Sequence, residues 1–156
     1  MSEKQDAEYF INKFVTVIKD NLNAKITAIN TAKGDSLLTA VDSNAYYYLT
    51  FGQRIPAYDP AVIFGASVEL EGDVRSEVTE RLIIAIEMVI SSKAEADPLQ
   101  VMARVQRYRR AIAEVILENY RSFPNLEFDA IPDVGFVEAN QFYYALGAVV
   151  KMVYTT

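Results

Sequence analysis

Three apolar segments with a two-residue period constrain the fold more than any other feature of this sequence. They are AVIFGASVEL (61–70), RLIIAIEMVISS (81–92) and NQFYYALGAVVKMVYTT (140–156). Successive side chains of a β-strand point to opposite faces, so this period predicts three long strands. The polar segment EGDVRSEVTE (71–80) lies between the first two and predicts a long hairpin with a mobile tip.

Both faces of the predicted sheet are rich in apolar side chains. One face takes alternate residues from Val62 to Leu70, from Leu82 to Ile90 and from Phe142 to Tyr154. The other face takes Ile63, Gly65, Ile83, Ala85, Val89, Tyr143, Ala145, Gly147, Val149 and Val153, with charge only at Glu69, Glu87 and Lys151. A sheet with helices on one side typically carries polar residues on the other. We therefore expect a neighbouring subunit to cover the second face.

The N-terminal part of the chain has the three- and four-residue spacing of an amphipathic helix. Over residues 6–22 the apolar stripe consists of Ala7, Phe10, Phe14, Val17 and Ile18. Ser2 and Gln5 are placed to form a capping box just before it. The pattern predicts that a second, short helix follows at AKITAINTA (24–32) and ends at Gly34.

A second amphipathic pattern predicts a long helix from Pro98 to about Tyr120. Asp97 is a good N-cap, and proline suits the first helical position that follows it. The expected core stripe consists of Val101, Val105, Tyr108, Ile112, Val115 and Ile116.

Residues 35–60 have no clean period and predict irregular structure, with a short strand near 46–50. A fourth strand of the main sheet is expected at NLEFDA (125–130) or at VGFVEA (134–139). Together these elements predict one α+β domain over 1–156. Its sheet is mixed, mostly antiparallel and of about four strands, with one long helix and an N-terminal helix packed on one face.

The composition excludes several kinds of active site. The chain contains no histidine and no cysteine, so it cannot build the usual zinc sets, a Ser-His-Asp triad or a thiol nucleophile. A net charge of -6 argues against broad binding to nucleic acid or to anionic membranes. The N-terminus lacks the apolar region of a signal peptide, and no apolar stretch is long enough to span a bilayer. We therefore expect a soluble, non-enzymatic protein without catalytic, cofactor-binding or metal-binding residues.

Five charged residues of the long helix form a stripe that we expect on the side away from the core. They are Arg104, Arg107, Arg110, Glu114 and Glu118. One interpretation is a solvated face with ordinary pairs, such as Arg110 with Glu114 four residues later. Another is a contact between copies, because the stripe is basic at one end and acidic at the other. Phosphate binding by the arginines is a third interpretation, which the acidic net charge disfavours.

The acidic segment ELEGD offers a possible cation site. Glu69, Glu71 and Asp73 alternate, so in an extended chain their side chains share a face that could hold a hard cation. The segment lacks the full ligand set of a calcium loop, and a solvated hairpin tip is the favoured interpretation.

The order of these elements resembles a family of phage proteins. YDPAVIF, the acidic-tipped hairpin, RLIIAIEMVI, RVQRYRRAIAEVILENY and YYALGAVVKMVY follow one another over residues 55–154. In this order and in the RYRRAI motif the chain is similar to the small tail terminator and tail-completion proteins of tailed bacteriophages. That resemblance implies a mixed sheet with helices on one face and a structural virion protein without catalytic residues.

The resemblance also implies partners. Such proteins form hexameric rings that cap the tail tube, stop its growth and present a surface to the head connector. The implied partners are further copies of the chain, the tail tube protein, the head-side connector protein and, in contractile tails, the sheath protein. The implied location is the tail or neck of the virion after synthesis in the host cytoplasm. Neither a membrane nor specific nucleic-acid binding is implied, although DNA could pass through the ring.

Two sets of contact residues follow as expectations. The charged stripe from Arg104 to Glu118 is expected at the subunit interface or in the lumen of the ring. The hairpin tip, with Glu71, Asp73, Arg75 and Glu77, is expected to contact the tube or the sheath. The alternatives are a head-closure or connector protein of the neck, a small carboxylate-based metal-binding domain or enzyme, and a nucleic-acid binder.

Overall fold

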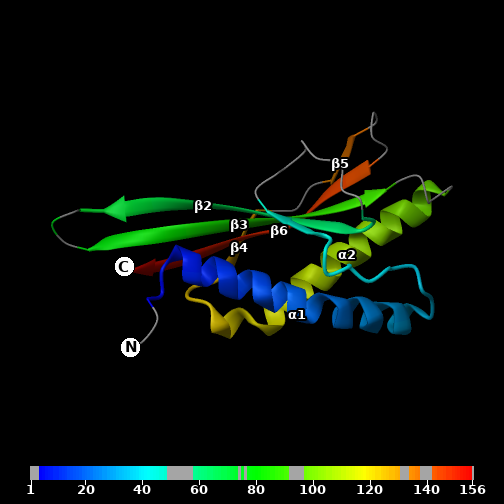
Figure 1. Cartoon of the computed structure of the whole chain (residues 1–156), viewed down its shortest axis with the longest axis horizontal. Coiled ribbons are helices and arrows are strands. Elements are labelled where there is room, and N and C mark those ends of the chain that lie inside the picture. The colour runs from blue at the N-terminus through cyan, green and yellow to red at the C-terminus, as the bar shows by residue number, and fades with distance from the viewer. Residues whose placement is uncertain are drawn as a thin grey trace.

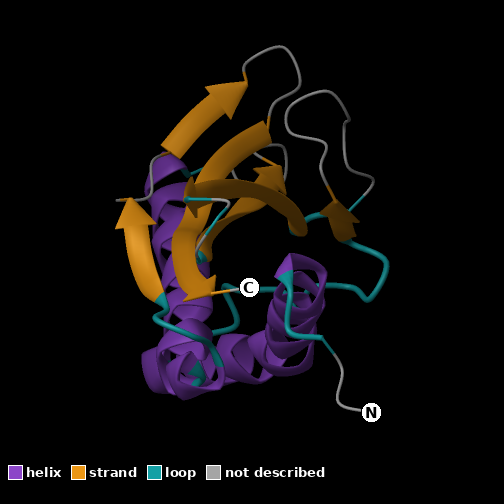
Figure 2. Ribbon diagram, turned by 90° about the vertical axis from the view of Figure 1, so that its left-hand side faces the viewer, coloured by secondary structure: helices purple, strands orange, loops and turns teal. Residues whose placement is uncertain are grey.

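The protein places two helices on one side of a curved β-sheet, as Figures 1 and 2 show. The computed structural model describes residues 4–48, 58–73, 75, 77–91, 97–130, 134–137 and 142–155, with only the backbone described at 91, 98, 130, 134–137 and 142–146. The helices are α1 (Ala7–Lys33) and α2 (Pro98–Glu118), and a short 3-10 helix, η1 (Tyr120–Ser122), follows α2.

Six strands of the described residues form the sheet. They are β1 (Tyr46–Tyr48), β2 (Ala61–Gly72), β3 (Val78–Ser91), β4 (Glu127–Ala130), β5 (Val134–Val137) and β6 (Phe142–Thr155). The order across the sheet is β1-β2-β3-β6-β4, and β5 also pairs with β6. Only β1 and β2 run parallel, and the other pairs are antiparallel. The predicted α+β class and mostly antiparallel sheet are therefore confirmed.

The strand count is higher than the expected four. Both candidate segments for a fourth strand are strands, and each pairs with β6 at a different part of its length. The long β6 has room for both, because Glu127 pairs opposite Lys151 whereas Val134 pairs opposite Ala145. The predicted short strand near 46–50 is present as β1.

Helix α1 is one continuous helix, so the prediction of two helices over this segment is wrong. Leu22 lies four residues after Ile18 and four before Ile26, and all three are fully buried. The apolar stripe therefore continues through residue 22 without a break. The N-cap is Asp6, whose carboxylate accepts a hydrogen bond from Tyr9 N at 3.0 Å, whereas the predicted cap Ser2 lies outside the described residues.

The predicted helix ends are otherwise correct. Gly34 stops α1 in the left-handed conformation with φ of 69°, which glycine adopts without strain. Asp97 caps α2 and accepts a hydrogen bond from Leu99 N at 2.9 Å. Helix α2 ends at Glu118, two residues before the predicted end, and the chain continues as η1.

The main core lies between the helices and the sheet. The core stripe predicted for α2 is buried in full, and from Val105 onward it packs in one cluster with α1 and the inner face of β2, β3 and β6. Its fully buried members include Phe14, Ile18, Leu22, Ile26, Tyr108, Ile112, Leu82, Ile84, Ile86, Met88 and Met152.

A β-bulge changes the predicted assignment of faces in β6. The β3–β6 register shifts between Ile86, opposite Ala148, and Glu87, opposite Leu146. One extra residue reverses the alternation of faces. Gly147 was assigned to the second face, but a Cβ atom there would point at α2, 2.6 Å from Ile112 Cδ1. The face assignments for 142–146 lie outside the described side chains.

The second face of the sheet is unevenly exposed. Ala61, Ile63 and Val89 are buried there in a second, small cluster, against which Tyr47 packs. Other members of this face, such as Ile83 and Val149, are half-buried. Its coverage by a neighbouring subunit stays a prediction.

Candidate interaction surfaces

Arg104 is buried inside the chain, so its predicted place on the side away from the core is wrong. Its side chain is 4% exposed, and Nη2 lies 3.3 Å from Asp59 Oδ1. The guanidinium also lies over the Tyr108 ring, 5.9 Å from the centroid. The reason is helical spacing, because position 104 is three residues after Val101 and four before Tyr108 and thus belongs to the buried stripe. Arg104 therefore holds the segment before β2 against α2.

Arg107 holds the segment that follows α1. Its Nη1 lies 2.9 Å and 2.8 Å from the two carboxylate oxygens of Asp35. This hydrogen bond, with a smaller contribution from Leu37 N–H, lowers the pKa of the Asp35 carboxyl below its usual value. A bonded guanidinium of this kind is a poor phosphate site, which weakens the phosphate interpretation of the stripe.

The other three charges of the stripe also have partners in the chain. Arg110 Nε lies 2.8 Å from Glu114 Oε1 on the exposed side of α2, as the four-residue spacing predicts. Glu118 forms an ion pair with Lys25 and so joins α2 to α1. The stripe therefore does not form one surface, and a role between subunits stays a prediction only for the exposed pair Arg110 and Glu114.

Three polar side chains hold the segment between α1 and β1, and two of them, together with the hydrogen bonds of the third, Tyr108, were not predicted from the sequence. Asn30 accepts a hydrogen bond from Leu38 N and donates one to Leu38 O, and Asn23 does the same with Val41. Tyr108 OH bonds both the N–H and the carbonyl of Thr39 at 2.8 Å. The sequence signal was the seven-residue spacing of the two asparagines, which places them on one face of α1.

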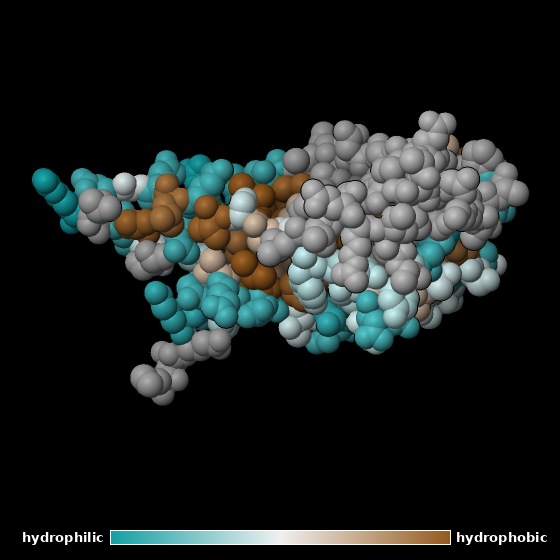
Figure 3. Space-filling model, turned by 45° about the horizontal axis from the view of Figure 1, so that its top comes forward, coloured by the Kyte–Doolittle hydropathy of each residue, from teal (hydrophilic) through white to brown (hydrophobic). Residues whose placement is uncertain are grey.

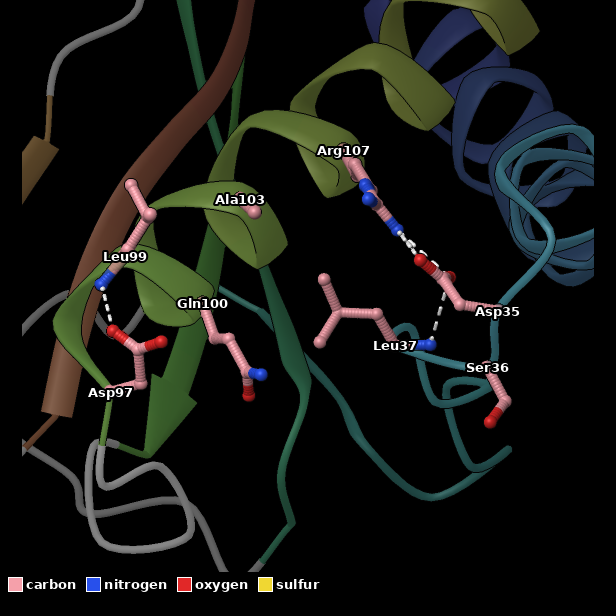
Figure 4. A pocket seen from close by; sticks show the side chains of 8 residues that line it. All are labelled: Asp35, Ser36, Leu37, Asp97, Leu99, Gln100, Ala103 and Arg107. Atoms are coloured by element: carbon pink, nitrogen blue, oxygen red, sulfur yellow. Dashed lines mark hydrogen bonds and ion pairs between the residues drawn. The ribbon is translucent and has the colours of Figure 1, made fainter.

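An open hollow of about 540 Å³ separates the start of α2 from the segment after α1. Figure 4 shows Arg107 and Asp35 pointing toward each other at one side of it, and Asp97 bonded to the backbone of Leu99 at the other. Its lining residues are Asp35, Ser36, Leu37, Asp97, Leu99, Gln100, Ala103 and Arg107. The charged groups shown there already form hydrogen bonds within the chain. They are therefore not free to bind a ligand in the hollow.

Helix α2 has a different exposed apolar patch near each end. The first patch consists of Leu99, which is 71% exposed, and Met102. The second patch consists of Leu117, which is 56% exposed, with Tyr120 and with Phe128 of β4. A shallow groove of about 250 Å³ lies in the second patch. Large exposed apolar patches mark surfaces that bind other molecules.

The distal part of the β2–β3 hairpin projects beyond α1 as an arm (Figure 1). Val68 and Leu70 were predicted on the same face as Val62 and Phe64, and unlike those two buried residues they are 42% and 69% exposed. They lie on the helix-facing side of the sheet, past the point where α1 begins at Ala7. Figure 3 shows the resulting apolar surface along the arm, with hydrophilic residues on both sides.

Two acidic residues of the arm have partners within the chain. Glu71 pairs with Arg81, and Asp73 accepts a hydrogen bond from Arg75 N at 2.9 Å within the turn. In the described part of the chain, no group of three carboxylates is placed to hold a metal ion. Glu77 is exposed, and the predicted contact of this tip with a tube or sheath stays a prediction.

Comparison with known proteins adds no family. No protein-family model matches the chain, and no curated protein matches it. Neither described helix combines the length and apolarity needed to cross a membrane.

Proposed function

We propose that this protein is a structural, non-enzymatic subunit of a tailed-phage virion, a tail terminator that forms a hexameric ring. In the tail or neck, the ring would cap the tail tube, meet the head-side connector protein and, in a contractile tail, touch the sheath. The proposal takes its specific assignment from the resemblance over residues 55–154. The feature of the fold that supports the proposal is the surface of α2.

The observation that carries the proposal is the pair of unlike apolar patches at the ends of α2. A closed ring needs a heterologous contact, in which one patch meets a different patch on the next copy. Met102 and Leu117 are fifteen residues apart, which corresponds to about 22 Å along a helix. The Leu99 patch of one subunit would pack on the Leu117 patch of its neighbour, with Arg110 and Glu114 between the two patches on the exposed face.

The experiment is a mass measurement by light scattering at rising concentration, followed by electron microscopy. Wild-type chain is expected to form six-membered rings. Leu99→Asp and Leu117→Asp should each abolish rings, because each buries a charge in one half of the contact. Ala24→Asp adds the same charge to an exposed position of α1 and should leave rings intact.

Mixing the two defective variants tests the heterologous geometry. Each keeps one intact patch, so the mixture should form a one-to-one dimer and no ring. Twelve-membered rings would instead favour a head-side adaptor of the neck. A wild-type chain that stays monomeric under every condition and matches its variants in mass would contradict the ring.

A further inference from the structure

Among the described residues, the distal half of β2 is paired on one side only, and its other edge is open. Strand β1 pairs with β2 only from Val62 to Phe64, and beyond that point the described residues of β2 pair with β3 alone. Val62 N–H donates to Ala45 O at 2.9 Å and therefore points away from β3. The β2–β3 register runs without a shift, so Ala66, Val68 and Leu70 direct their backbone N–H and C=O groups to the same outer side. Such an edge is a template for one more strand.

An apolar groove runs beside this edge on the helix side. A cavity of about 170 Å³ lies between Ile11 and Val15 of α1 and Phe64 and Ala66 of β2. By strand alternation the exposed Val68 and Leu70 share the face of Phe64 and Ala66 and continue it toward the tip of the arm. Figure 3 shows an apolar surface along the arm. A strand added to the edge would place every second side chain against this groove.

The arm carries a net negative charge, with acidic residues on both of its faces. Side chains alternate along β2, so Glu69 and Glu71 lie on the face away from the groove. Residues 69–81 as a whole contain five acidic and two basic residues, a net charge of −3. Arg81 lies opposite Glu69 and is paired with Glu71, whereas Glu80 lies opposite Leu70 on the groove side. A second copy paired through its own β2 edge would bring these glutamates together, which is unfavourable. The net negative charge of the arm therefore favours a basic segment over a second copy of this chain at the edge.

We propose that the open edge of β2, from Ala66 to Leu70, binds an extended basic segment of a different protein by β-strand addition. The segment alternates apolar and basic residues. Its apolar side chains fill the groove that begins at Ile11 and continues over Val68. Its basic side chains lie beside Glu69 and Glu71 on the other face. This contact needs only the monomer and does not depend on the proposed ring.

The first test uses a fluorescent peptide, acetyl-Lys-Val-Lys-Val-Lys-Val-Lys-amide, and measures binding to the full chain by anisotropy. Two further versions carry N-methyl groups on alternate backbone nitrogens, either at the valines or at the lysines. One of them should bind about tenfold more weakly, because it loses hydrogen bonds to the edge while its charge and apolar groups remain. A glutamate-for-lysine peptide should also lose binding. Equal binding of both methylated versions and the parent peptide would overturn strand addition.

The second test changes the edge itself. Val68→Pro removes an N–H that faces outward and leaves the β2–β3 hydrogen bonds in place, as proline permits on an edge strand. It should weaken peptide binding by about tenfold relative to Val68→Thr, which keeps the N–H at the same site. Glu69→Lys should weaken binding of the lysine peptide and strengthen that of the glutamate peptide. Unfolding midpoints establish that each variant is folded.

Two outcomes would overturn the proposal on the protein side. In one, Val68→Pro and Val68→Thr bind the peptide equally. In the other, light scattering shows that the wild-type chain self-associates and that Val68→Pro alone abolishes this, which would make a second copy the occupant. The α2 patches lie away from the β2 edge. A failure to form rings would therefore leave peptide binding unaffected, and a failure to bind the peptide would leave ring formation unaffected.

Discussion

Arg104 is buried because the helix period places it in the core stripe, and its charge is balanced by Asp59. Breaking a buried pair by removing one partner leaves a charge without compensation. Arg104→Met keeps much of the packing and is expected to lower the free energy of unfolding by about 2–4 kcal/mol. Arg110→Met, on the exposed face, should cost under about 0.5 kcal/mol. Urea denaturation of both variants checks this, and equal losses would contradict the buried role of Arg104.

Gly147 is a site of close approach between α2 and the sheet. A Cβ atom there would lie 2.6 Å from Ile112 Cδ1 and 3.2 Å from Ile86 O. Gly147→Ala should therefore destabilise the chain by about 1–3 kcal/mol through overpacking. Ile112→Val removes the clashing methyl group, so the double variant should lose less than the sum of the two single losses. Strict additivity in thermal unfolding would count against this contact.

Glu87 is a partly buried carboxyl on the second face of the sheet, and burial raises its pKa above the usual value. The unfolded chain then releases the proton more readily than the folded one, so ionisation lowers stability as pH rises above about 4.5. Glu87→Gln should be more stable than wild type at pH 7, and the difference should vanish below the unfolded pKa. Melting temperatures of both proteins, measured from below the unfolded pKa up to pH 7, test this prediction. A stability difference that does not change with pH would exclude ionisation of Glu87 as its cause.

At the scale of elements, the segment between α1 and β1 is ordered by side chains rather than by its own backbone pairing. Asn30 supplies both a donor and an acceptor to Leu38. Asn30→Asp keeps the acceptor but replaces the donor by an oxygen that repels Leu38 O, so it should cost about 1–3 kcal/mol. Hydrogen exchange at the amides of Leu38 and Val41 should accelerate in this variant. Unchanged protection of both amides would show that the asparagine does not hold the segment.

Most helices and strands could be predicted from the spacing of apolar residues in the sequence. The three long strands, the burial of the α2 stripe, the Asp97 cap and the Gly34 stop each depend on residues within a few positions of one another. The errors at Arg104 and in α1 were misread local spacing, whereas those in the sheet arose where distant residues compete. The bulge at Gly147 lies in the pairing of β6 with β3, and it turns Gly147 toward Ile112. Both alternatives for the fourth strand formed because β6 is long enough to pair with each.

At the scale of the whole molecule, the arm contributes surface rather than core. Leu70 is well exposed past the start of α1, whereas Leu82 on the neighbouring strand is fully buried. Leu70→Ser should change the free energy of unfolding by less than about 0.5 kcal/mol. Leu82→Ala should cost about 2–5 kcal/mol through the cavity it creates. Chemical denaturation compares the two, and a large loss for Leu70→Ser would mean that the arm is packed.

The sequence by itself determined the α+β class, the three long strands, helix α2 with its Asp97 cap, and the stop at Gly34, because these follow from periodicity and local backbone chemistry. It also excluded histidine- and cysteine-based sites. Only the tertiary structure decided which distant acids Arg104 and Arg107 meet and which apolar residues stay exposed. Arg107 meets Asp35 across 72 positions, and Leu70 is exposed because α1 starts too far along the sheet to cover it. Such outcomes depend on where separate elements end relative to one another in space, which no local pattern encodes.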